Sequence, residues 1–225
     1  MVSRKLMGTW AFLDFCLLAA GAIALAFSIV WRSPNVLMNF VISSADLTAG
    51  TVLGVSLLAT FVISIGAIIQ RNHVTIGLVI LNYILVADAF VVGIVGSFIW
   101  FYTLRERNNF HLVWAEAAPA TRIFLQDHFQ CCGYFNGTDI AEIGGTFCSS
   151  QGFVDGLNAT VTTNFCVAPV TAFADYTLNN IFTTIYGFMA IVLSLLLASL
   201  CVIKKRNEDE RFKRIDAKRG GRGFV

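Results

Sequence analysis

Four cysteines gather in the second half of the chain, and their spacing limits the chemistry that they can do. Cys131, Cys132, Cys148 and Cys166 could form disulfides or, together with His128, bind zinc. An even number of cysteines on the oxidising side of a membrane favours disulfides, because zinc requires reduced thiols. A bridge between the neighbours Cys131 and Cys132 would strain the backbone, so two pairings remain open. In both, each closed loop contributes about 2–4 kcal/mol of stability, and we predict no metal site.

Two carboxylates, Asp14 and Asp88, stand within long apolar runs. An ionised carboxylate inside a bilayer costs about 2.5 kcal/mol or more, so both side chains must face other helices, either protonated or hydrogen-bonded. At about 1.5 Å per residue, Asp14 and Asn82 reach nearly the same depth. We therefore expect a hydrogen bond between Asp14 and Asn82 that fixes the rotation of their helices.

The composition explains why these polar groups must be embedded. Of the 225 residues, 56% are hydrophobic and only 13% are charged, and the mean hydropathy is +0.72. A soluble domain carries about 25% charge, so a cytosolic enzyme, a disordered chain and a nucleic-acid binder are excluded. No phosphate-binding glycine loop, paired-histidine zinc motif or nucleophile elbow occurs in the sequence. We predict a protein that is not an enzyme and has no catalytic residue.

Four apolar runs are each long enough to cross a hydrocarbon layer about 30 Å thick. They predict an all-α membrane protein, a four-helix transmembrane bundle that carries a disulfide-stapled and mainly helical outer lobe. The predicted spans are residues 7–30, 52–69, 74–101 and 181–203. The segments between them are a terminus at 1–6, a small outer loop at 31–51, a turn at 70–73, a large outer loop at 102–180 and a tail at 204–225.

The basic residues are unevenly distributed about these spans. Of the 16 Lys and Arg residues, 12 fall in the two terminal segments and the 70–73 turn. Positive charge is retained on the cytoplasmic side, so both termini should be cytoplasmic. We expect the plasma membrane as the location. Two glycosylation sequons, which begin at Asn136 and Asn158, fall in the large outer loop and agree with this orientation.

The large outer loop shows helical periodicity at both ends. The third helix is expected to continue outward to Pro119, and a second helix to run over 121–130. On the return, the same spacing from Val170 should lead directly into the fourth span. Residues 134–165 show no sustained period and suit an irregular surface. Two interpretations of this surface stay open, a contact site for partners and a solvated cap covered by glycans.

The triplet Cys131-Cys132-Gly133, placed in a large outer loop between the third and fourth of four spans, resembles the tetraspanin family. The resemblance covers the whole chain, including the cysteine-free small loop and the two loop cysteines downstream. It implies that Cys131 pairs with Cys166 and Cys132 with Cys148. It also implies a membrane organiser that binds other membrane proteins, and itself, laterally through the large outer loop and the transmembrane faces.

The chain departs from the family pattern in two places. Gly145-Thr146-Phe147-Cys148 replaces the usual Pro-x-Ser-Cys motif, and the fourth span lacks the usual Glu or Gln. The first departure, with the short chain, is more similar to fungal tetraspanins of the Pls type. That resemblance implies a role in fungal infection-structure development and host penetration.

Asp14 and Asp88 admit three interpretations. They can be structural hydrogen-bonding groups, which general principles favour, or they can line a cavity for a sterol or lipid between helices, as the tetraspanin fold allows. The third is a small channel or transporter that uses both carboxylates, although the paired half-helix repeats typical of transporters are missing.

Cys201 lies three residues before Lys204-Lys205-Arg206, where a membrane-bound acyltransferase can reach a thiol. Tetraspanins are palmitoylated at similar juxtamembrane cysteines, so Cys201 is the predicted lipidation site. The tail that follows carries nine bases and four acids. This charge predicts contact with anionic membrane lipids and a charged helix that ends before Gly220-Gly221.

Overall fold

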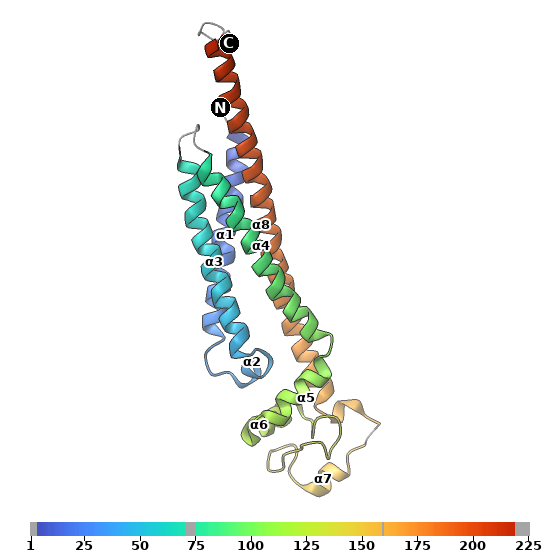
Figure 1. Ribbon diagram of the computed structural model, residues 1–225. Coiled ribbons are helices and arrows are strands. Elements are labelled where there is room, and N and C mark those ends of the chain that lie inside the picture. Colours follow the sequence, from blue (N-terminus) through green and yellow to red (C-terminus); the bar gives the residue numbers. More distant parts are fainter. Residues whose placement is uncertain (1–3, 71–74, 159, 219–225) are drawn as a thin grey trace. The chain divides into compact units, whose positions relative to one another are not determined.

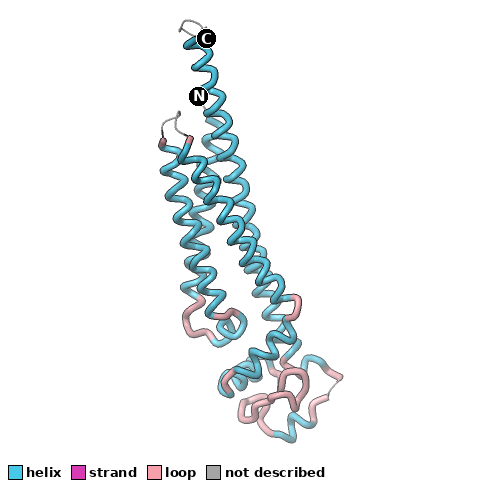
Figure 2. The backbone as a smooth tube through the Cα atoms, viewed as in Figure 1, coloured by secondary structure: helices cyan, strands magenta, loops and turns pink. Residues whose placement is uncertain are grey.

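The computed structural model describes residues 4–70, 75–158 and 160–218, and within these ranges every regular element is a helix (Figures 1 and 2). The long helices are α1 (Arg4–Val30), α3 (Ser44–Ile69), α4 (Ile76–Thr103) and α8 (Val167–Lys218). The short ones are α2 (Val36–Val41), α5 (Glu106–Glu116), α6 (Pro119–Phe129), α7 (Gln151–Asp155) and the 3-10 helix η1 (Thr162–Asn164). All four long helices are long and apolar enough to cross a membrane. The chain is the all-α membrane protein that its sequence predicts.

The described residues form two compact units. The first, called here the helical bundle, comprises 4–30, 47–70, 75–95 and 185–218. The second, called here the disulfide lobe, comprises 31–46, 96–158 and 160–184. In the helical bundle, neighbouring helices run in alternating directions, so the start of α1 and the end of α8 lie at the same end (Figure 1).

Helices α1 and α3 approach closely because two glycines face each other. A Cβ atom added to Gly54 would lie 2.7 Å from Leu25 Cγ and 3.1 Å from the Gly21 carbonyl oxygen. A Cβ atom on Gly21 would lie 2.9 Å from Leu58 Cδ2. Small residues at such crossings allow backbones to pack against each other inside a membrane.

The buried face of α4 repeats at alternating intervals of three and four residues. This heptad spacing places one row of side chains against the other helices, whereas bulky apolar side chains elsewhere on α4 face outward. The buried row consists of Leu78, Leu81, Leu85, Asp88 and Val92, and the exposed side chains include Tyr83, Phe90 and Phe98.

The start of α3 differs from the predicted span. The helix begins at Ser44, well before residue 52, because Ser43 and Asp46 cap it reciprocally. The Ser43 backbone N–H donates to Asp46 Oδ2 at 3.0 Å, and the Asp46 backbone N–H donates to Ser43 Oγ at 3.2 Å. Hydropathy marks the apolar section, whereas capping groups mark where a helix starts. Part of the predicted small outer loop is therefore helical, in α2 and the first turns of α3.

The third span does not continue outward as one helix, and this expectation was wrong. Helix α4 ends at Thr103, and a separate helix, α5, begins at Glu106 after Arg105 leaves helical geometry. The Asn109 side-chain amide donates to the Tyr102 carbonyl oxygen at 2.9 Å and so satisfies a group that the break exposes. Periodicity alone cannot detect such a break, because both helices keep an apolar face.

The other expected helices are present. Helix α6 starts at Pro119, two residues before the predicted 121, because proline is well suited to the first turn of a helix. Helix α8 is continuous from Val167 through the fourth span to Lys218, as the periodicity and the charged tail predicted. The turn at 70–73 and Gly220-Gly221 fall mostly or wholly outside the described residues.

Candidate functional site

Two disulfides join the four lobe cysteines. Cys131 is bonded to Cys166 with an S–S distance of 2.04 Å, and Cys132 is bonded to Cys148 with 1.97 Å. This is the pairing that the resemblance implies. All four residues are buried, so the bridges form the centre of the lobe. No thiolate among them is left for zinc, and the His128 ring packs against Phe124 and Phe129.

Gly133 is required at its position by both its conformation and its surroundings. Its φ angle is +68°, and an added Cβ atom would lie 2.1 Å from the Asn136 carbonyl oxygen. On either side, the Cys132 N–H donates to the Asn164 carbonyl at 2.9 Å, and the Cys166 N–H donates to the Gly133 carbonyl at 2.9 Å. The Cys-Cys-Gly triplet therefore lets the chain turn while two disulfides and two backbone hydrogen bonds fasten it to residues 164–166.

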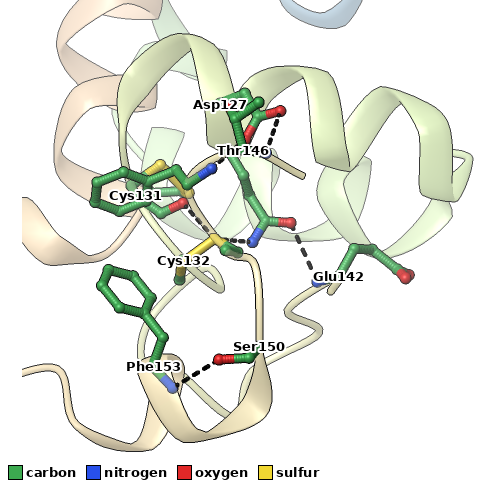
Figure 3. The surroundings of a disulfide bond; sticks show 11 residues. Asp127, Cys131, Cys132, Glu142, Thr146, Ser150 and Phe153 are labelled. Carbon is green, nitrogen blue, oxygen red and sulfur yellow. Dashed lines mark hydrogen bonds between the residues drawn. A yellow bond between two sulfur atoms is a disulfide. The ribbon is translucent and has the colours of Figure 1, made fainter. Parts of the chain in front are cut away.

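Polar side chains on α6 hold residues 142–148, at the end of the loop that the Cys132–Cys148 disulfide closes (Figure 3). Gln126 is 1% exposed; its Nε2 donates to Cys148 Sγ at 2.9 Å, and its Oε1 accepts from the Glu142 N–H at 3.1 Å. Asp127 accepts from the Phe147 N–H at 2.8 Å and the Thr146 N–H at 3.0 Å. The bond from Phe147 is the main reason that the pKa of Asp127 lies below its usual value.

These contacts show what holds the Gly145-Thr146-Phe147-Cys148 segment in place. A Cβ atom on Gly145 would lie 2.5 Å from Asp127 Oδ1, so a residue without a side chain allows the carboxylate to approach the two N–H groups. Neither Gln126 nor Asp127 was predicted, because their partners are backbone groups and a cysteine sulfur that sequence spacing does not assign to them.

Arg122, on α6, contacts both the end of α5 and the loop that the Cys132–Cys148 disulfide closes. It is 9% exposed, and its Nη1 donates to the carbonyls of Trp114, Ala115 and Ala117 at 3.3, 3.3 and 2.8 Å. Its Nη2 and Nε bind Glu142 Oε1, at 2.5 and 3.1 Å. A guanidinium at the C-terminal end of a helix satisfies otherwise unpaired carbonyls and interacts favourably with the helix dipole.

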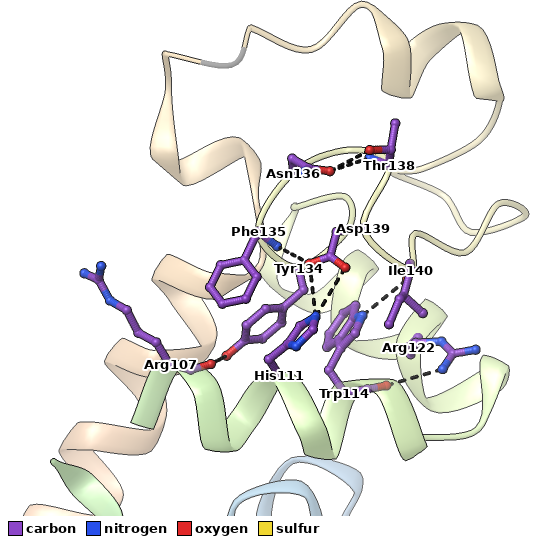
Figure 4. A network of polar contacts seen from close by, with 10 residues as sticks. All are labelled: Arg107, His111, Trp114, Arg122, Tyr134, Phe135, Asn136, Thr138, Asp139 and Ile140. Atoms are coloured by element: carbon purple, nitrogen blue, oxygen red, sulfur yellow. Dashed lines mark hydrogen bonds and ion pairs between the residues drawn. The ribbon is translucent and has the colours of Figure 1, made fainter. Parts of the chain in front are cut away.

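A network of aromatic and polar side chains attaches α5 to the turn at 134–140 (Figure 4). Tyr134 donates to the Arg107 carbonyl at 2.9 Å, and Trp114 Nε1 donates to the Ile140 carbonyl at 3.2 Å. His111 Nε2 lies 3.2 Å from the Asp139 carboxylate. Burial, with a smaller effect from nearby Glu106, raises the pKa of the Tyr134 hydroxyl, so Tyr134 stays a hydrogen-bond donor.

Glu106 is the one acid of the lobe for which an oxygen atom is both buried and unpaired in the described residues. Its Oε2 has no hydrogen-bond partner there. Burial raises the pKa of Glu106, the Asp175 carboxylate raises it further, and Arg107 opposes both effects. The folded lobe therefore favours protonated Glu106 more strongly than water does.

Both sequons lie on the lobe surface in the same local geometry. Asn136 Oδ1 accepts from the Thr138 N–H at 3.0 Å and from the Thr138 hydroxyl at 2.7 Å. Asn158 Oδ1 accepts from the Thr160 N–H at 3.0 Å and from its hydroxyl at 2.8 Å. Both asparagines are exposed; Ala159 of the second sequon lies outside the described residues.

Residues 134–165 expose large apolar side chains although the segment is fastened by disulfides. Four of these side chains are called here the exposed loop residues. They are Phe135, Ile143, Phe153 and Val161, exposed by 41, 44, 41 and 41%. Loops on a rigid scaffold are where binding residues concentrate.

A groove of about 420 Å³ lies elsewhere on the lobe, between α2 and the α5–α6 corner. Its walls combine apolar side chains with the Asn35 and Asn39 amides and the Glu116 carboxylate. Such a lining fits a side chain that has both an apolar stem and hydrogen-bond donors. The lining residues are Pro34, Asn35, Val36, Asn39, Phe40, Val113, Glu116, Ala117 and Thr121.

In the helical bundle both predicted carboxylates face inward, but the partner predicted for Asp14 is wrong. Asp14 and Asp88 are 4 and 5% exposed. Thr60 donates to Asp88 Oδ2 at 2.5 Å. The predicted bond between Asp14 and Asn82 is absent: within the described chain, neither Asp14 Oδ1 nor Asn82 Oδ1 has a hydrogen-bond partner.

The reason for this correction is helix rotation. Asn82 lies beside the buried row of α4. The α1–α3 contacts place Ser64 of α3 level with Asp14, without a hydrogen bond between them. Equal depth in the bilayer does not ensure that two side chains face each other. Helix α3, whose polar residues Thr60 and Ser64 were not singled out from the sequence, supplies both neighbours.

The two remaining cysteines are free thiols. Cys201 is exposed on α8, whereas Cys16 is only partly exposed on α1. This difference agrees with the sequence-based choice of Cys201 for modification, which stays a prediction.

No family model, curated protein or solved structure matches this chain.

Proposed function

We propose that this protein is a tetraspanin-like membrane organiser that binds other membrane proteins laterally and assembles them into complexes. The observation that carries the proposal is the combination of four membrane-spanning helices with a Cys131-Cys132-Gly133 turn that two disulfides fasten. This arrangement supplies a rigid lobe and four lipid-facing helices, and it offers surface rather than reactive groups.

The exposed loop residues support a binding role for the lobe. Phe135 and Phe153 belong to the segment that the disulfides and the α6 side chains immobilise. A surface that is already rigid loses little conformational entropy on binding, so exposed aromatic groups there contribute more to affinity. We therefore place the partner contacts on residues 134–165, with lateral contacts along the transmembrane faces.

The orientation proposed with this function has both termini in the cytoplasm and the disulfide lobe outside the plasma membrane. The positive-inside distribution, the two disulfides and the exposed sequons at Asn136 and Asn158 support it. Palmitoylation of Cys201, a sterol or lipid between the helices and the fungal developmental role implied by the Pls-type resemblance belong to the same proposal.

The function is tested by cross-linking the full-length protein in cells, followed by extraction in mild detergent and mass spectrometry. We expect a defined set of membrane proteins that is lost when Phe135→Ser and Phe153→Ser are combined. Leu112→Ser is the matched control, because Leu112 is 64% exposed on α5 outside the 134–165 segment. Recovery of the same partners from the double variant would contradict the proposed contact site, and the absence of any specific partner would contradict the function.

The competing hypothesis is a channel or transporter that uses Asp14 and Asp88. It requires ion or proton flux through vesicles that contain the protein. A pH-dependent flux that Asp88→Asn abolishes would support the transporter hypothesis over the organiser. Absence of flux would support the organiser.

A further inference from the structure

The groove between α2 and the α5–α6 corner rests on a floor of packed aromatic rings. Phe40 of α2 is 8% exposed and lines the groove. Its ring centroid lies 6.0 Å from that of Phe110 and 6.2 Å from that of Trp114, both of which are completely buried on α5. These ring contacts fix α2 against α5, so the groove is formed before anything binds in it.

Glu116 contributes a carboxylate to the groove from the last residue of α5. An anion is unfavourable at this position, because the C-terminal end of a helix already carries partial negative charge. Arg122, the cation that binds the same helix end, is engaged by three carbonyls and by Glu142. Within the described residues Glu116 takes part in no hydrogen bond or ion pair. Its carboxylate therefore lacks a cationic partner inside the lobe.

Asn39 contributes an amide oxygen to the groove from α2. The neighbouring Asn35 uses its Oδ1 to cap α2, where it accepts from the N–H groups of Leu37 and Met38 at 3.2 and 3.3 Å. The Asn39 side chain has no hydrogen-bond partner in the part of the chain that the structure describes. The groove therefore has a free acceptor on α2 as well as the carboxylate on α5.

The charge of the whole disulfide lobe also favours a cationic partner. The lobe contains eight Asp and Glu residues but only four Arg and no Lys, a net charge of −4, whereas the complete chain has a net charge of +2. An excess of one sign attracts the opposite charge over a distance and repels partners of like charge.

We infer that this groove binds an arginine side chain presented by the outer part of a partner membrane protein. The apolar stem of an arginine fits against Val36, Phe40 and Val113, which line the groove. Its planar guanidinium has five N–H donors, enough to bind the Glu116 carboxylate through two of them and the Asn39 amide oxygen through a third. Lysine offers a single, more strongly hydrated ammonium group and fits this pair of acceptors less well.

This inference rests on the proposed function and adds the chemistry of one contact. The arginine site is separate from residues 134–165, so the lobe would hold a partner at two places. A groove that is already formed loses little conformational entropy when a side chain enters it.

The test uses two small probes and the full-length protein in lipid nanodiscs. The probes are N-acetyl-arginine methylamide and N-acetyl-citrulline methylamide, which share the apolar stem, but citrulline carries a neutral urea in place of the guanidinium. Binding is measured by saturation-transfer NMR, with empty nanodiscs as the blank. We expect the arginine probe to bind at least fivefold more tightly than the citrulline probe. Equal affinity of the two probes, or no binding of the arginine probe, would overturn the inference.

Variants assign this binding to the groove. Glu116→Gln should weaken binding of the arginine probe at least fivefold, whereas Asn39→Asp, which adds a second carboxylate, should strengthen it at least threefold. Asp155→Asn is the control, because it removes the same charge from an exposed residue outside the groove. Unchanged affinity in Glu116→Gln, or an equal loss in Asp155→Asn, would overturn the site.

The three substituted side chains are all exposed, and each change keeps their size, so the variants are expected to fold. The probes bind without any partner protein. This test can therefore fail while cross-linking still identifies partners, and it can succeed if cross-linking finds none.

Discussion

Several side chains of the disulfide lobe form hydrogen bonds to backbone groups. Arg122, Gln126 and Asp127 bind carbonyl or N–H groups of segments that have little regular structure of their own. Such groups must be satisfied when they are buried, so each of these side chains removes an unfavourable contribution as well as adding a favourable one. Three polar residues of α6 thereby determine the course of a long irregular loop.

Replacing Gly133 with alanine is expected to destabilise the lobe by at least about 2 kcal/mol, because its φ angle is positive and an added Cβ would collide with the Asn136 carbonyl oxygen. Thermal unfolding of the oxidised protein measures the change. Gly152→Ala is the control, since nothing lies within 4 Å of a Cβ atom at that position. Equal stability of the two variants would show that the tight turn is not needed.

Glu106→Gln is expected to raise the Tm at neutral pH, because burial raises the pKa of Glu106 and its ionised form is unfavourable in the folded lobe. The sign follows from proton binding. The folded state holds the proton more tightly than the unfolded state, so the native protein loses stability as the pH rises from the usual glutamate value through the raised one.

The measurement is the Tm of both proteins over the range from pH 4 to 8, where the difference should shrink toward the acidic end. Asp127→Asn provides the contrast of opposite sign. Backbone donors lower the pKa of Asp127, so Asp127 stabilises the folded protein when the pH is above the usual aspartate pKa. This stabilisation is lost as the pH falls through the lowered pKa. A Glu106→Gln variant that is less stable at every pH would contradict the assignment.

Among the helices, packing in the bundle depends on where backbones come close. Gly21 and Gly54 mark the crossing of α1 and α3, and the antiparallel register that follows from it brings Asp14 to Ser64. Inside a lipid bilayer, apolar contacts between helices gain little over contacts with lipid, so close packing and polar contacts decide which faces meet.

Gly54→Leu should therefore separate α1 from α3 and lower the thermal stability of the protein in detergent by several degrees. The added side chain has no space, because even a Cβ atom would lie 2.7 Å from Leu25. Gly66→Leu, on the same helix, adds the same group where nothing lies within 4 Å, and its Tm should stay close to that of the unmodified protein. Matching losses in both variants would refute the crossing.

For the molecule as a whole, the two disulfides are the covalent links that hold the lobe together. The Cys131–Cys166 bridge joins residues 35 positions apart, and the Cys132–Cys148 bridge joins residues 16 apart. Longer closed loops restrict the unfolded chain more strongly, so the first bridge is expected to contribute more, about 3–4 kcal/mol. A lobe of this size has a limited hydrophobic core and depends on such links.

We expect the combined Cys131→Ser and Cys166→Ser variant to be retained inside the cell, while Cys132→Ser with Cys148→Ser shows a smaller defect. Surface labelling of intact cells gives the fraction delivered. Cys16→Ser, which removes a free thiol of α1, should be delivered normally. Normal delivery of the Cys131 and Cys166 variant would show that the lobe folds without its longer link.

The sequence alone determined the properties that depend on composition and short-range spacing. Apolar runs require helices in a bilayer, because every backbone group must be paired there, and the even set of cysteines in one loop predicted disulfides. The inward direction of Asp14 and Asp88 followed from the energy of exposing a carboxylate to lipid. These conclusions depend on whether a segment lies in lipid or in water, and the composition of each segment is enough to decide that.

Only the tertiary structure decided which groups meet. The break between α4 and α5, the hold of α6 on residues 142–148 and the pairing of Asp88 with Thr60 all depend on backbone groups or helix rotation. A rotation of one helix by a fraction of a turn changes the neighbour of a side chain without changing its depth or its periodicity. For that reason Asn82, predicted as the partner of Asp14, lies beside the buried row and forms no hydrogen bond with Asp14.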